Sequence, residues 1–366
     1  MENTNMNIPV TTVNGIVGMM AQVYEDAVKS KVMLVDLPTP FLWGAPGVGK
    51  SEGIYQLANN LSRRTGKRVV VTDVRLLLFS PVDLRGVPVS DKNREFTNWL
   101  CPRIFCMDSS SDTLNILFLD ELTAAPQSVQ AAAYQICLDR CVGEHKLPEN
   151  CIVIAAGNRT TDRSVSYKMP KALCNRLMHF LIEPSYVEWK QWALDHQIDE
   201  RIIGYLGFDG SKLCMEPENS DLAYPTPRSW SFVSRLIHNC NDNLSNAHAL
   251  ISSCIGVDTA LSFEEWCKVY RTLPKTQDIL EGKCKAYPKS HDALYALCSG
   301  LTATLYRNKD TITDAQLNNV CAYALRFPPD FVVSLFGDLN REETLKLKLM
   351  NNRLFNVWLH NNRHSV

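Results

Sequence analysis

The 366-residue chain has no long hydrophobic run, and its apolar stretches fall short of the ~18 residues that cross a bilayer. Its first ten residues, MENTNMNIPV, are polar and contain no basic segment, so we expect neither a secretory signal nor a membrane span. An excess of one charge is also missing, because 38 Lys and Arg stand against 39 Asp and Glu. Sequence-blind nucleic-acid binders usually carry a strong positive excess, so this balance disfavours that class and leaves room only for a local basic groove.

Metal-ligand spacing is absent as well, although the chain has 13 cysteines. The closest pairs, Cys101/Cys106 and Cys137/Cys141, are not C-x-x-C, and the 8 histidines include no H-E-x-x-H. An odd, scattered set of cysteines is typical of small apolar core residues in a reducing compartment. We therefore expect a cytoplasmic protein without a zinc site or a disulfide framework.

The segments that are present alternate between strand-like and helix-like patterns through the first ~185 residues. Aliphatic or β-branched runs predict strands, and apolar residues at helical spacing predict helices. The predicted helices cover 10–30, 51–64 and 128–138, and the predicted strands cover 40–43, 68–74, 115–119 and 151–155. Such alternation is typical of an α/β fold with a mostly parallel sheet and helices on both faces.

From residue 186 onward, helical patterns dominate and no strand is predicted. A chain of this length favours two domains, at about 150 residues each. We therefore expect an α/β domain over 1–185 and a helical region over 186–366. Its last stretch, 341–360, is predicted to be one amphipathic helix with these residues near one face: Leu345, Leu349, Leu354, Val357 and Trp358.

The strongest motif is GAPGVGKS, which matches G-x-x-x-x-G-K-S/T at every fixed position. Its glycines let the backbone curl so that successive N–H groups point at phosphate oxygens, and the next helix directs its positive dipole end at the same anion. Lys50 would reach the β- and γ-phosphates of a nucleotide, and the Ser51 hydroxyl would ligate Mg²⁺. The candidate nucleotide-binding residues are Gly44, Ala45, Pro46, Gly47, Val48, Gly49, Lys50 and Ser51.

Two later strand ends supply candidate catalytic residues. The run ILFLDE places Asp120 and Glu121 at the end of a buried strand, the edge where α/β sheets bind their ligands. Asp120 would hold Mg²⁺, and Glu121 would polarise the attacking water. Asn158 follows the next predicted strand and could hydrogen-bond both the γ-phosphate and that water, or it could simply cap a turn.

These elements, in this order, resemble those of AAA+ ATPases, and more specifically the MoxR-like branch of the dynein-related group. The resemblance implies a P-loop AAA+ domain with a parallel sheet, followed by an all-α lid and C-terminal helices, and it implies Mg²⁺-dependent ATP hydrolysis. It covers roughly 11–237. The segments that carry it are GAPGVGKS (44–51), PVDLRGVP (81–88), LFLDELTAAPQSVQAAAYQ (117–135), GEHKLPENCIVIAAGNRTTDRS (143–164), MPKALCNRLMHF (169–180) and TPRSW (226–230).

The resemblance also implies rings, usually hexamers, in which an arginine from the neighbouring subunit completes each site. Arg176, in the run NRL, is the candidate for this arginine finger. Arg228 matches the sensor 2 arginine, which the family carries on its lid. Arg163 lies in NRTTDRS, which also resembles a motif of GTP-cleaving restriction AAA+ proteins and would place this residue near the subunit interface. A structural ion pair is the plain alternative for these arginines.

Two further segments resemble family elements that touch a partner. Residues 79–103 resemble the helix-2 insert, a hairpin-like excursion, and residues 141–151 resemble the pre-sensor-1 hairpin. The insert could contact a threaded or remodelled partner, but its aromatic residues could equally pack it onto the domain. The residues in question are Arg85, Lys92, Arg94, Phe96 and Trp99.

The resemblance therefore implies a ring-forming, ATP-hydrolysing protein that remodels or matures a separate protein partner, one with a von Willebrand A-type domain. The first alternative is the NTPase motor subunit of a nucleic-acid-processing or restriction-type defence system, which NRTTDRS mildly favours and the near-neutral charge disfavours. The second is a nucleotide-switched scaffold without turnover, and the presence of Glu121, Asn158 and Arg176 argues against it.

Overall fold

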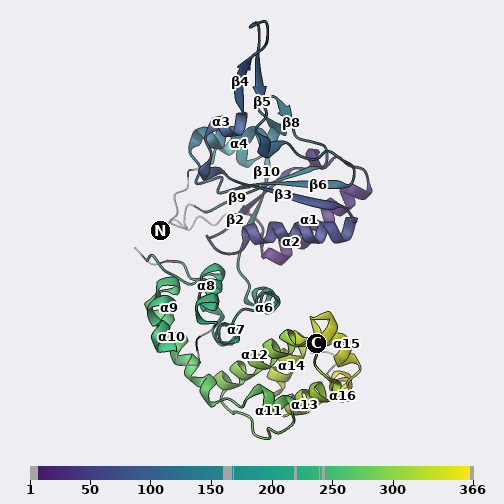
Figure 1. Cartoon of the computed structure of the whole chain (residues 1–366), viewed down its shortest axis with the longest axis vertical. Helices are drawn as coiled ribbons and strands as arrows, with labels where there is room; N and C mark the ends of the chain where they lie inside the picture. The colour runs from purple at the N-terminus through teal and green to yellow at the C-terminus, as the bar shows by residue number, and fades with distance from the viewer. Residues whose placement is uncertain are drawn as a thin grey trace. The chain divides into compact units, whose positions relative to one another are not determined.

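The computed structural model describes residues 7–159, 167, 169–217, 221–238, 240 and 244–362. It divides into two compact units, one ending at Pro184 and the other beginning at Ser185, and each is described by itself (Figure 1). Within the described ranges, no helix is both long enough and apolar enough to span a bilayer.

The first unit is built on a six-stranded sheet in which every neighbouring pair of strands is parallel. The strands are β1 (Val10–Thr11), β2 (Thr39–Trp43), β3 (Arg68–Arg75), β6 (Thr113–Asp120), β9 (Cys151–Gly157) and β10 (Leu177–Ile182). Their spatial order is β1-β10-β2-β9-β6-β3, so β9 lies between the strand that precedes the glycine-rich loop and the strand that ends in Asp120. This parallel α/β architecture confirms the predicted fold class.

The amino acids of the central strands explain their place in the sheet. β9 is apolar throughout, β6 is apolar except for Thr113, Asn115 and Asp120, and both strands are buried on both faces, as strands between two helix layers must be. Their register pairs Leu119 with Ala155, and β2 joins β9 with Leu42 opposite Ala156. The carboxyl ends of β2, β9 and β6 therefore meet at one edge of the sheet.

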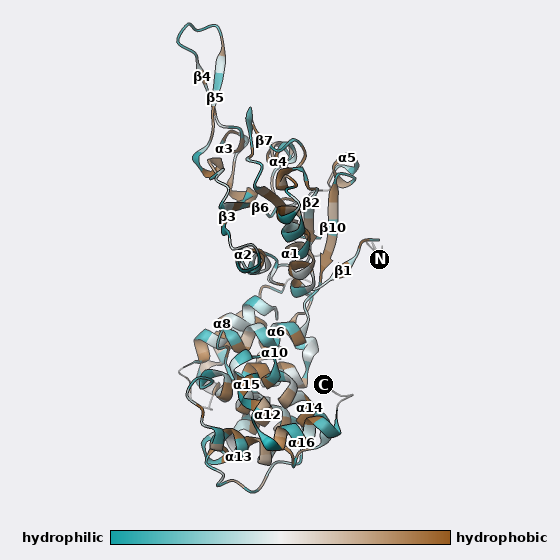
Figure 2. Ribbon diagram, turned by 90° about the vertical axis from the view of Figure 1, so that its right-hand side faces the viewer, coloured by the Kyte–Doolittle hydropathy of each residue, from teal (hydrophilic) through white to brown (hydrophobic). Residues whose placement is uncertain are grey.

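Helices cover both faces of this sheet (Figure 1). α1 (Val13–Lys29) and α2 (Lys50–Thr65) pack together over one face, where Leu57 is buried. α4 (Gln127–Asp139) covers the opposite face, and its Ile136 belongs to the hydrophobic core that includes residues of β2, β6 and β9. Figure 2 shows strands β6 and β10 as mainly hydrophobic.

The N-terminal segment differs from the predicted helix over 10–30. The edge strand β1 takes up its first two residues and pairs with β10, and α1 begins only at Val13. The Thr12 side chain accepts a hydrogen bond from the Gly15 backbone N–H (3.2 Å), which caps the helix at this point. β10 is a second strand that the sequence pattern does not predict, because a short apolar run such as LMHFLI is not assigned to strand or helix by periodicity alone.

Within the segment 79–103, a short helix is followed by an antiparallel hairpin. A second, smaller hairpin lies within 141–151. The elements are α3 (Pro81–Arg85), β4 (Val87–Ser90), β5 (Thr97–Leu100), β7 (Cys141–Val142) and β8 (His145–Lys146). The two hairpins touch each other, since His145 Nε2 lies 2.7 Å from the carbonyl oxygen of Trp99.

The aromatic residues of the insert have different surroundings. Phe96 is 70% exposed, so it does not pack the insert onto the domain, whereas Trp99 is half-buried beside the second hairpin. Arg85, Lys92 and Arg94 are exposed. Figure 2 shows the tip of the β4–β5 hairpin as hydrophilic.

Among its described residues, the second unit contains helices and no strands, as predicted for the region after residue 185. Its helices are α6 (Tyr186–Asp195), α7 (Glu200–Phe208), α8 (Pro227–Ile237), α9 (His248–Ile255), α10 (Val257–Cys267), α11 (Thr276–Leu280), α12 (His291–Arg307), α13 (Asp314–Ala324), α14 (Pro329–Asn340), α15 (Glu343–Met350) and α16 (Arg353–Asn361). One continuous hydrophobic cluster joins them, and it includes the ring contacts of Tyr205 with Trp230, Phe263 and Trp266.

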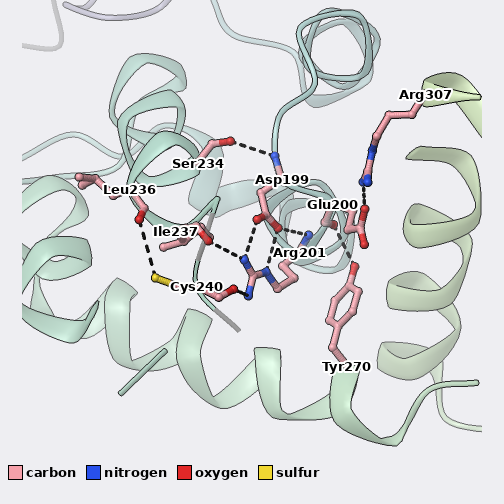
Figure 3. A network of polar contacts seen from close by, with 9 residues as sticks. All are labelled: Asp199, Glu200, Arg201, Ser234, Leu236, Ile237, Cys240, Tyr270 and Arg307. Carbon is pink, nitrogen blue, oxygen red and sulfur yellow. Dashed lines mark hydrogen bonds and ion pairs between the residues drawn. The ribbon is translucent and has the colours of Figure 1, made fainter. Parts of the chain in front are cut away.

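Arg201, which forms a buried ion pair with Asp199 at the start of α7, connects this helix to the end of α8 (Figure 3). Arg201 Nη2 lies 2.7 Å from Asp199 Oδ2, and the two side chains are 8% and 9% exposed. The same guanidinium donates to the carbonyls of Ile237 and Cys240, at 3.0 and 3.3 Å. Because a helix leaves its last carbonyls without partners inside the helix, Arg201 supplies donors that the end of α8 lacks. Ser234, on α8, accepts a hydrogen bond from the Asp199 backbone N–H (2.9 Å).

The C-terminal stretch 341–360 is two helices, α15 and α16, and the prediction of a single helix is wrong. The Asn352 side chain accepts a hydrogen bond from the Phe355 backbone N–H (3.1 Å) and so starts α16 anew. This new start changes which residues face the core. Phe355 and Leu345 are fully buried, while Val357, predicted on the apolar face, is 55% exposed.

Candidate active site

The glycine-rich loop lies between β2 and α2, at the carboxyl edge of the sheet. Gly49 is the N-cap of α2 and has a φ of 102°, a left-handed conformation in which a side chain would be strained. α2 therefore begins directly at the loop, so the backbone N–H groups of its first turn lie beside it. Such a loop and helix start are suited to bind phosphate groups.

Lys50 connects this loop to the neighbouring strand. Its Nζ donates to the carbonyls of Gly44 (2.5 Å) and Ala45 (3.0 Å) and to Asn158 Oδ1 (3.0 Å). The ammonium group is thus folded over the loop and faces the end of β9. The two residues were predicted as a phosphate-binding lysine and a γ-phosphate sensor, and here they are direct hydrogen-bond partners.

Ser51 and Asp120 form a second direct contact at this edge, since Ser51 Oγ donates to Asp120 Oδ2 (2.8 Å). A hydroxyl and a carboxylate are oxygen ligands of the kind that Mg²⁺ prefers, so the pair fits this ion. Among the described residues, no cluster of three or more His, Cys, Asp or Glu could hold a metal by itself. Mg²⁺ usually takes one or two protein ligands plus substrate phosphates, and this donor set is of that kind.

Glu121 stands immediately after this pair and has an unusual backbone. Its φ is 58°, which is uncommon for a residue with a side chain and recurs at functional sites. The Glu121 backbone N–H donates to Asp120 Oδ1 (2.8 Å), so both oxygens of Asp120 accept hydrogen bonds from neighbours. The left-handed turn ends β6 sharply and leaves Glu121 half-buried at the strand end.

Thr123 positions Asn158, and the sequence motifs did not single it out. Its hydroxyl accepts from the Asn158 backbone N–H (3.0 Å) and donates to the Asn158 carbonyl (3.1 Å). Gly157 allows this close approach, because a Cβ there would lie 2.7 Å from the Thr123 side chain and 2.9 Å from the Phe41 ring. The only signal in the sequence is that a threonine stands two residues after Glu121, and this spacing alone does not indicate a role for it.

Asp73, on β3, is a second residue that sequence reasoning missed. The register pairs it with Phe118 and pairs Arg75 with Asp120, so Asp73 lies one step diagonally from Asp120 on the same face. Burial raises the pKa of the Asp73 carboxyl, and the nearby Asp120 carboxylate raises it further. Its Oδ1 is buried and has no hydrogen-bond partner among the described residues.

The three candidate arginines lie in different parts of the chain. Arg176 follows α5 (Lys171–Cys174), is exposed, and is anchored through its backbone N–H to the Leu173 carbonyl (2.8 Å). Arg228 is exposed in the first turn of α8, whose N-cap is the side chain of Thr226. It belongs to the second unit, whereas the phosphate loop belongs to the first. Arg163 lies outside the described residues.

No protein-family model matches the chain, and no curated protein has a matching sequence. Among solved structures, similar folds include C. elegans PCH-2 (17% identity, TM-score 0.35), covering 70% of this chain and 66% of that one. A Thermotoga maritima RuvB mutant has 14% identity and a TM-score of 0.35, with coverages of 84% and 89%. Brucella abortus NtrX in complex with ATP has 12% identity and a TM-score of 0.34, with coverages of 90% and 68%. All of these identities and TM-scores are low.

Proposed function

We propose that the chain is an AAA+ ATPase that hydrolyses ATP with Mg²⁺. The observation that carries the proposal is a pair of contacts at three neighbouring strand ends. Lys50 donates to Asn158, and Ser51 donates to Asp120, so the ends of β2, β9 and β6 meet at the phosphate loop. Two pairs of candidate site residues, Lys50 with Asn158 and Ser51 with Asp120, are therefore hydrogen-bonded at this edge of the sheet.

Binding of ATP would use the loop N–H groups and the start of α2 for the phosphates. Lys50 would exchange its loop carbonyls for the β- and γ-phosphate oxygens. Ser51 and Asp120 would hold Mg²⁺, which neutralises charge on the phosphates when bound. Thr123 would keep Asn158 in place, so that its amide can meet the γ-phosphate.

Hydrolysis would use Glu121 as the group that accepts a proton from the attacking water, with Asn158 orienting that water. Arg176 is exposed after a short helix and would be offered to the site of the neighbouring subunit. There it would neutralise charge that develops on the transferred phosphoryl group. Arg163 is a second proposed interface arginine, and it rests on the sequence resemblance alone.

The proposal extends to a ring, usually a hexamer in the family that the sequence resembles. An arginine supplied in trans needs a head-to-tail interface, which gives a ring when its rotation closes. Arg228 would act as sensor 2 from the second unit and so couple nucleotide state to domain closure. The work of the ring would be to remodel or mature a protein partner with a von Willebrand A-type domain. The exposed β4–β5 hairpin, with Phe96 uncovered, is suited to reach such a partner.

The proposed activity is tested by comparing ATP binding with ATP turnover. Glu121→Gln should bind ATP normally and lose turnover about 10²- to 10⁴-fold, because it lacks the proton acceptor. Lys50→Ala should lose binding itself, and Arg63→Ala, at an exposed position near the far end of α2, is the matched control. Turnover by Glu121→Gln at the wild-type rate would contradict the proposal. Stimulation by DNA or RNA with a steep salt dependence would favour the nucleic-acid motor instead.

A further inference from the structure

A histidine in β10 links the strand that feeds the phosphate loop to the helix that precedes Arg176. Trp43 is the last residue of β2, directly before Gly44, and it is buried. Its indole Nε1–H donates to His179 Nδ1 at 3.0 Å. On the other side of the ring, His179 Nε2 lies 2.7 Å from the carbonyl oxygen of Cys174, the last residue of α5.

The two contacts together determine which nitrogen of His179 carries the proton. The indole nitrogen can only donate, so Nδ1 must accept. Nε2 then carries the hydrogen and donates to the Cys174 carbonyl, as a neutral imidazole with one donor and one acceptor. Phenylalanine, the apolar residue closest in shape, could make neither bond.

The position of the Cys174 carbonyl matters because α5 has only 4 residues. A helix this short has few bonds of its own, and its last carbonyls need partners from outside. His179 supplies one of them. Arg176 follows two residues later, and its backbone N–H is tied to Leu173 in the same helix (2.8 Å). The placement of Arg176 therefore depends on α5, and that of α5 depends on His179.

Packing alone does not account for this arrangement. The rings of Phe41, Trp43 and His179 form one cluster, with centroids 4.5 Å apart for the first two and 5.9 and 6.0 Å from His179 to each. A phenylalanine at position 179 would preserve such a cluster. The two hydrogen bonds are the feature that requires histidine.

We propose that His179 is a positioning residue that couples the phosphate loop of a subunit to the arginine finger the same subunit offers to its neighbour. The inference rests on the proposed function and deepens it. A movement at Gly44 on nucleotide binding would shift Trp43, and through His179 it would reach α5 and Arg176. Coupling of this kind is reciprocal, so placing the finger in a neighbour would also stabilise the occupied loop.

Subunit mixing tests this coupling, because it separates a defect in a subunit's own site from a defect in its finger. Lys50→Ala should lose ATP binding at its own site but keep its arginine finger. Arg176→Ala should keep an intact nucleotide site but lack the arginine finger. Their equimolar mixture should recover about a quarter of the wild-type turnover per subunit, since one head-to-tail interface in four combines two good halves. His179→Phe, alone, should be slowed about 10- to 100-fold by a misplaced finger.

The coupling predicts that His179→Phe behaves as a finger variant. Mixed with Lys50→Ala it should recover turnover, and mixed with Arg176→Ala it should not. Its own affinity for a fluorescent ATP analogue should stay within about 2-fold of wild type, a change worth only ~0.4 kcal/mol. Trp43→Phe should show the same pattern more weakly, and His179→Gln, which keeps a donor for Cys174, should be partly rescued.

His145→Phe is the matched control, because it removes a contact to a carbonyl of the same 2.7 Å length elsewhere in this unit. Recovery of His179→Phe only with Arg176→Ala, wild-type turnover of His179→Phe alone, or recovery with neither partner would each overturn the coupling. If Lys50→Ala and Arg176→Ala fail to complement each other, the shared site itself is wrong and the coupling falls with it.

Discussion

Asn158 illustrates how single residues at this site depend on support from elsewhere in the chain. Its side chain meets Lys50, while its backbone is held at both N–H and carbonyl by the hydroxyl of Thr123. Thr123 is only 2% exposed, so removal of its hydroxyl would leave buried polar groups without partners.

Thr123→Val should therefore lower the stability of the first unit by about 1–3 kcal/mol. ATP turnover should fall with it, because Asn158 loses the bonds that hold its backbone. Thr123→Ser keeps the hydroxyl and should stay close to wild type in both respects. Urea unfolding and steady-state turnover measure the two effects, and equal behaviour of the Val and Ser variants would contradict this role of the hydroxyl.

The cysteines give a prediction that depends on pH. Burial raises the pKa of the Cys137 thiol to about 12, and that of Cys151 to about 12 as well. Only the thiolate reacts with alkylating reagents, and a thiol with a pKa of about 12 is about one part in 10⁴ thiolate at pH 8. Native protein at pH 8 should therefore label at the exposed Cys106 and not at these two.

Mass spectrometry of the alkylated protein checks this expectation, and labelling in urea, where all 13 cysteines should react, is its control. Raising the pH increases the thiolate fraction of a buried thiol, so any native labelling of Cys137 should grow as pH rises. Labelling of Cys137 as fast as Cys106 in the native state would show that it is accessible and that the core assignment is wrong.

Residues of the site were predictable from the sequence where one local motif contains all of the chemistry. The phosphate loop is contiguous, so Lys50 and Ser51 could be identified without a structure. Thr123 and His179 could not, because their partners lie 35 and 136 positions away in the chain. A threonine and a histidine are common core residues, and only the fold brings each of them to its functional neighbour.

At the scale of elements, α8 is held at both of its ends. The Thr226 side chain caps its start, and Arg201 donates to carbonyls at its end while it pairs with Asp199. Arg228 stands in the first turn of this helix. The ion pair is buried, so loss of one partner would leave an uncompensated charge in the core.

Arg201→Ala should lower the stability of the second unit by about 3–5 kcal/mol, the usual cost of breaking a buried pair. The exposed pair of Lys268 and Glu265 is the matched control, and Lys268→Ala should cost at most about 1 kcal/mol. Urea unfolding followed by far-ultraviolet circular dichroism measures both. Equal losses of stability for the two variants would contradict the proposal that Arg201 stabilises the end of α8.

The β4–β5 hairpin gives a test of the two interpretations of its aromatic residues. Phe96 is 70% exposed, so Phe96→Ala should change stability by less than about 0.5 kcal/mol and leave basal ATP turnover unchanged. Phe105→Ala, at a position that is 4% exposed at the base of the insert, should cost about 3–5 kcal/mol. A large stability loss for Phe96→Ala would mean that the residue packs the insert onto the domain.

Elements were predictable where the hydrophobic pattern is strong. The strands β2, β3, β6 and β9 and the helices α2 and α4 follow from it within a few residues. β10 and the break between α15 and α16 could not be predicted from this pattern, for two physical reasons. The run LMHFLI of β10 is short and apolar, so its periodicity does not distinguish a strand from a helix. The break depends on one capping hydrogen bond, from the Phe355 backbone N–H to the Asn352 side chain, within a run that is otherwise helical.

At the scale of the whole molecule, the proposed site combines a phosphate loop and two supporting strand ends of one subunit with an exposed arginine of its neighbour. In the proposed site, Arg176 contacts the nucleotide bound by a neighbouring subunit, not the nucleotide of its own subunit. Its exposed position after α5 can therefore contribute to catalysis only when subunits assemble. Each subunit supplies the nucleotide-binding half of one such site and the arginine of the next. Assembly is therefore the central claim of the proposal.

The most direct test of this claim is ATP turnover per subunit, measured over a wide range of protein concentration and repeated with Arg176→Ala. Specific activity should rise steeply with concentration as rings form. Arg176→Ala should lose about 10³- to 10⁵-fold in rate, as expected for an arginine finger, while it still binds ATP. Specific activity that is independent of concentration and survives Arg176→Ala would contradict the shared site.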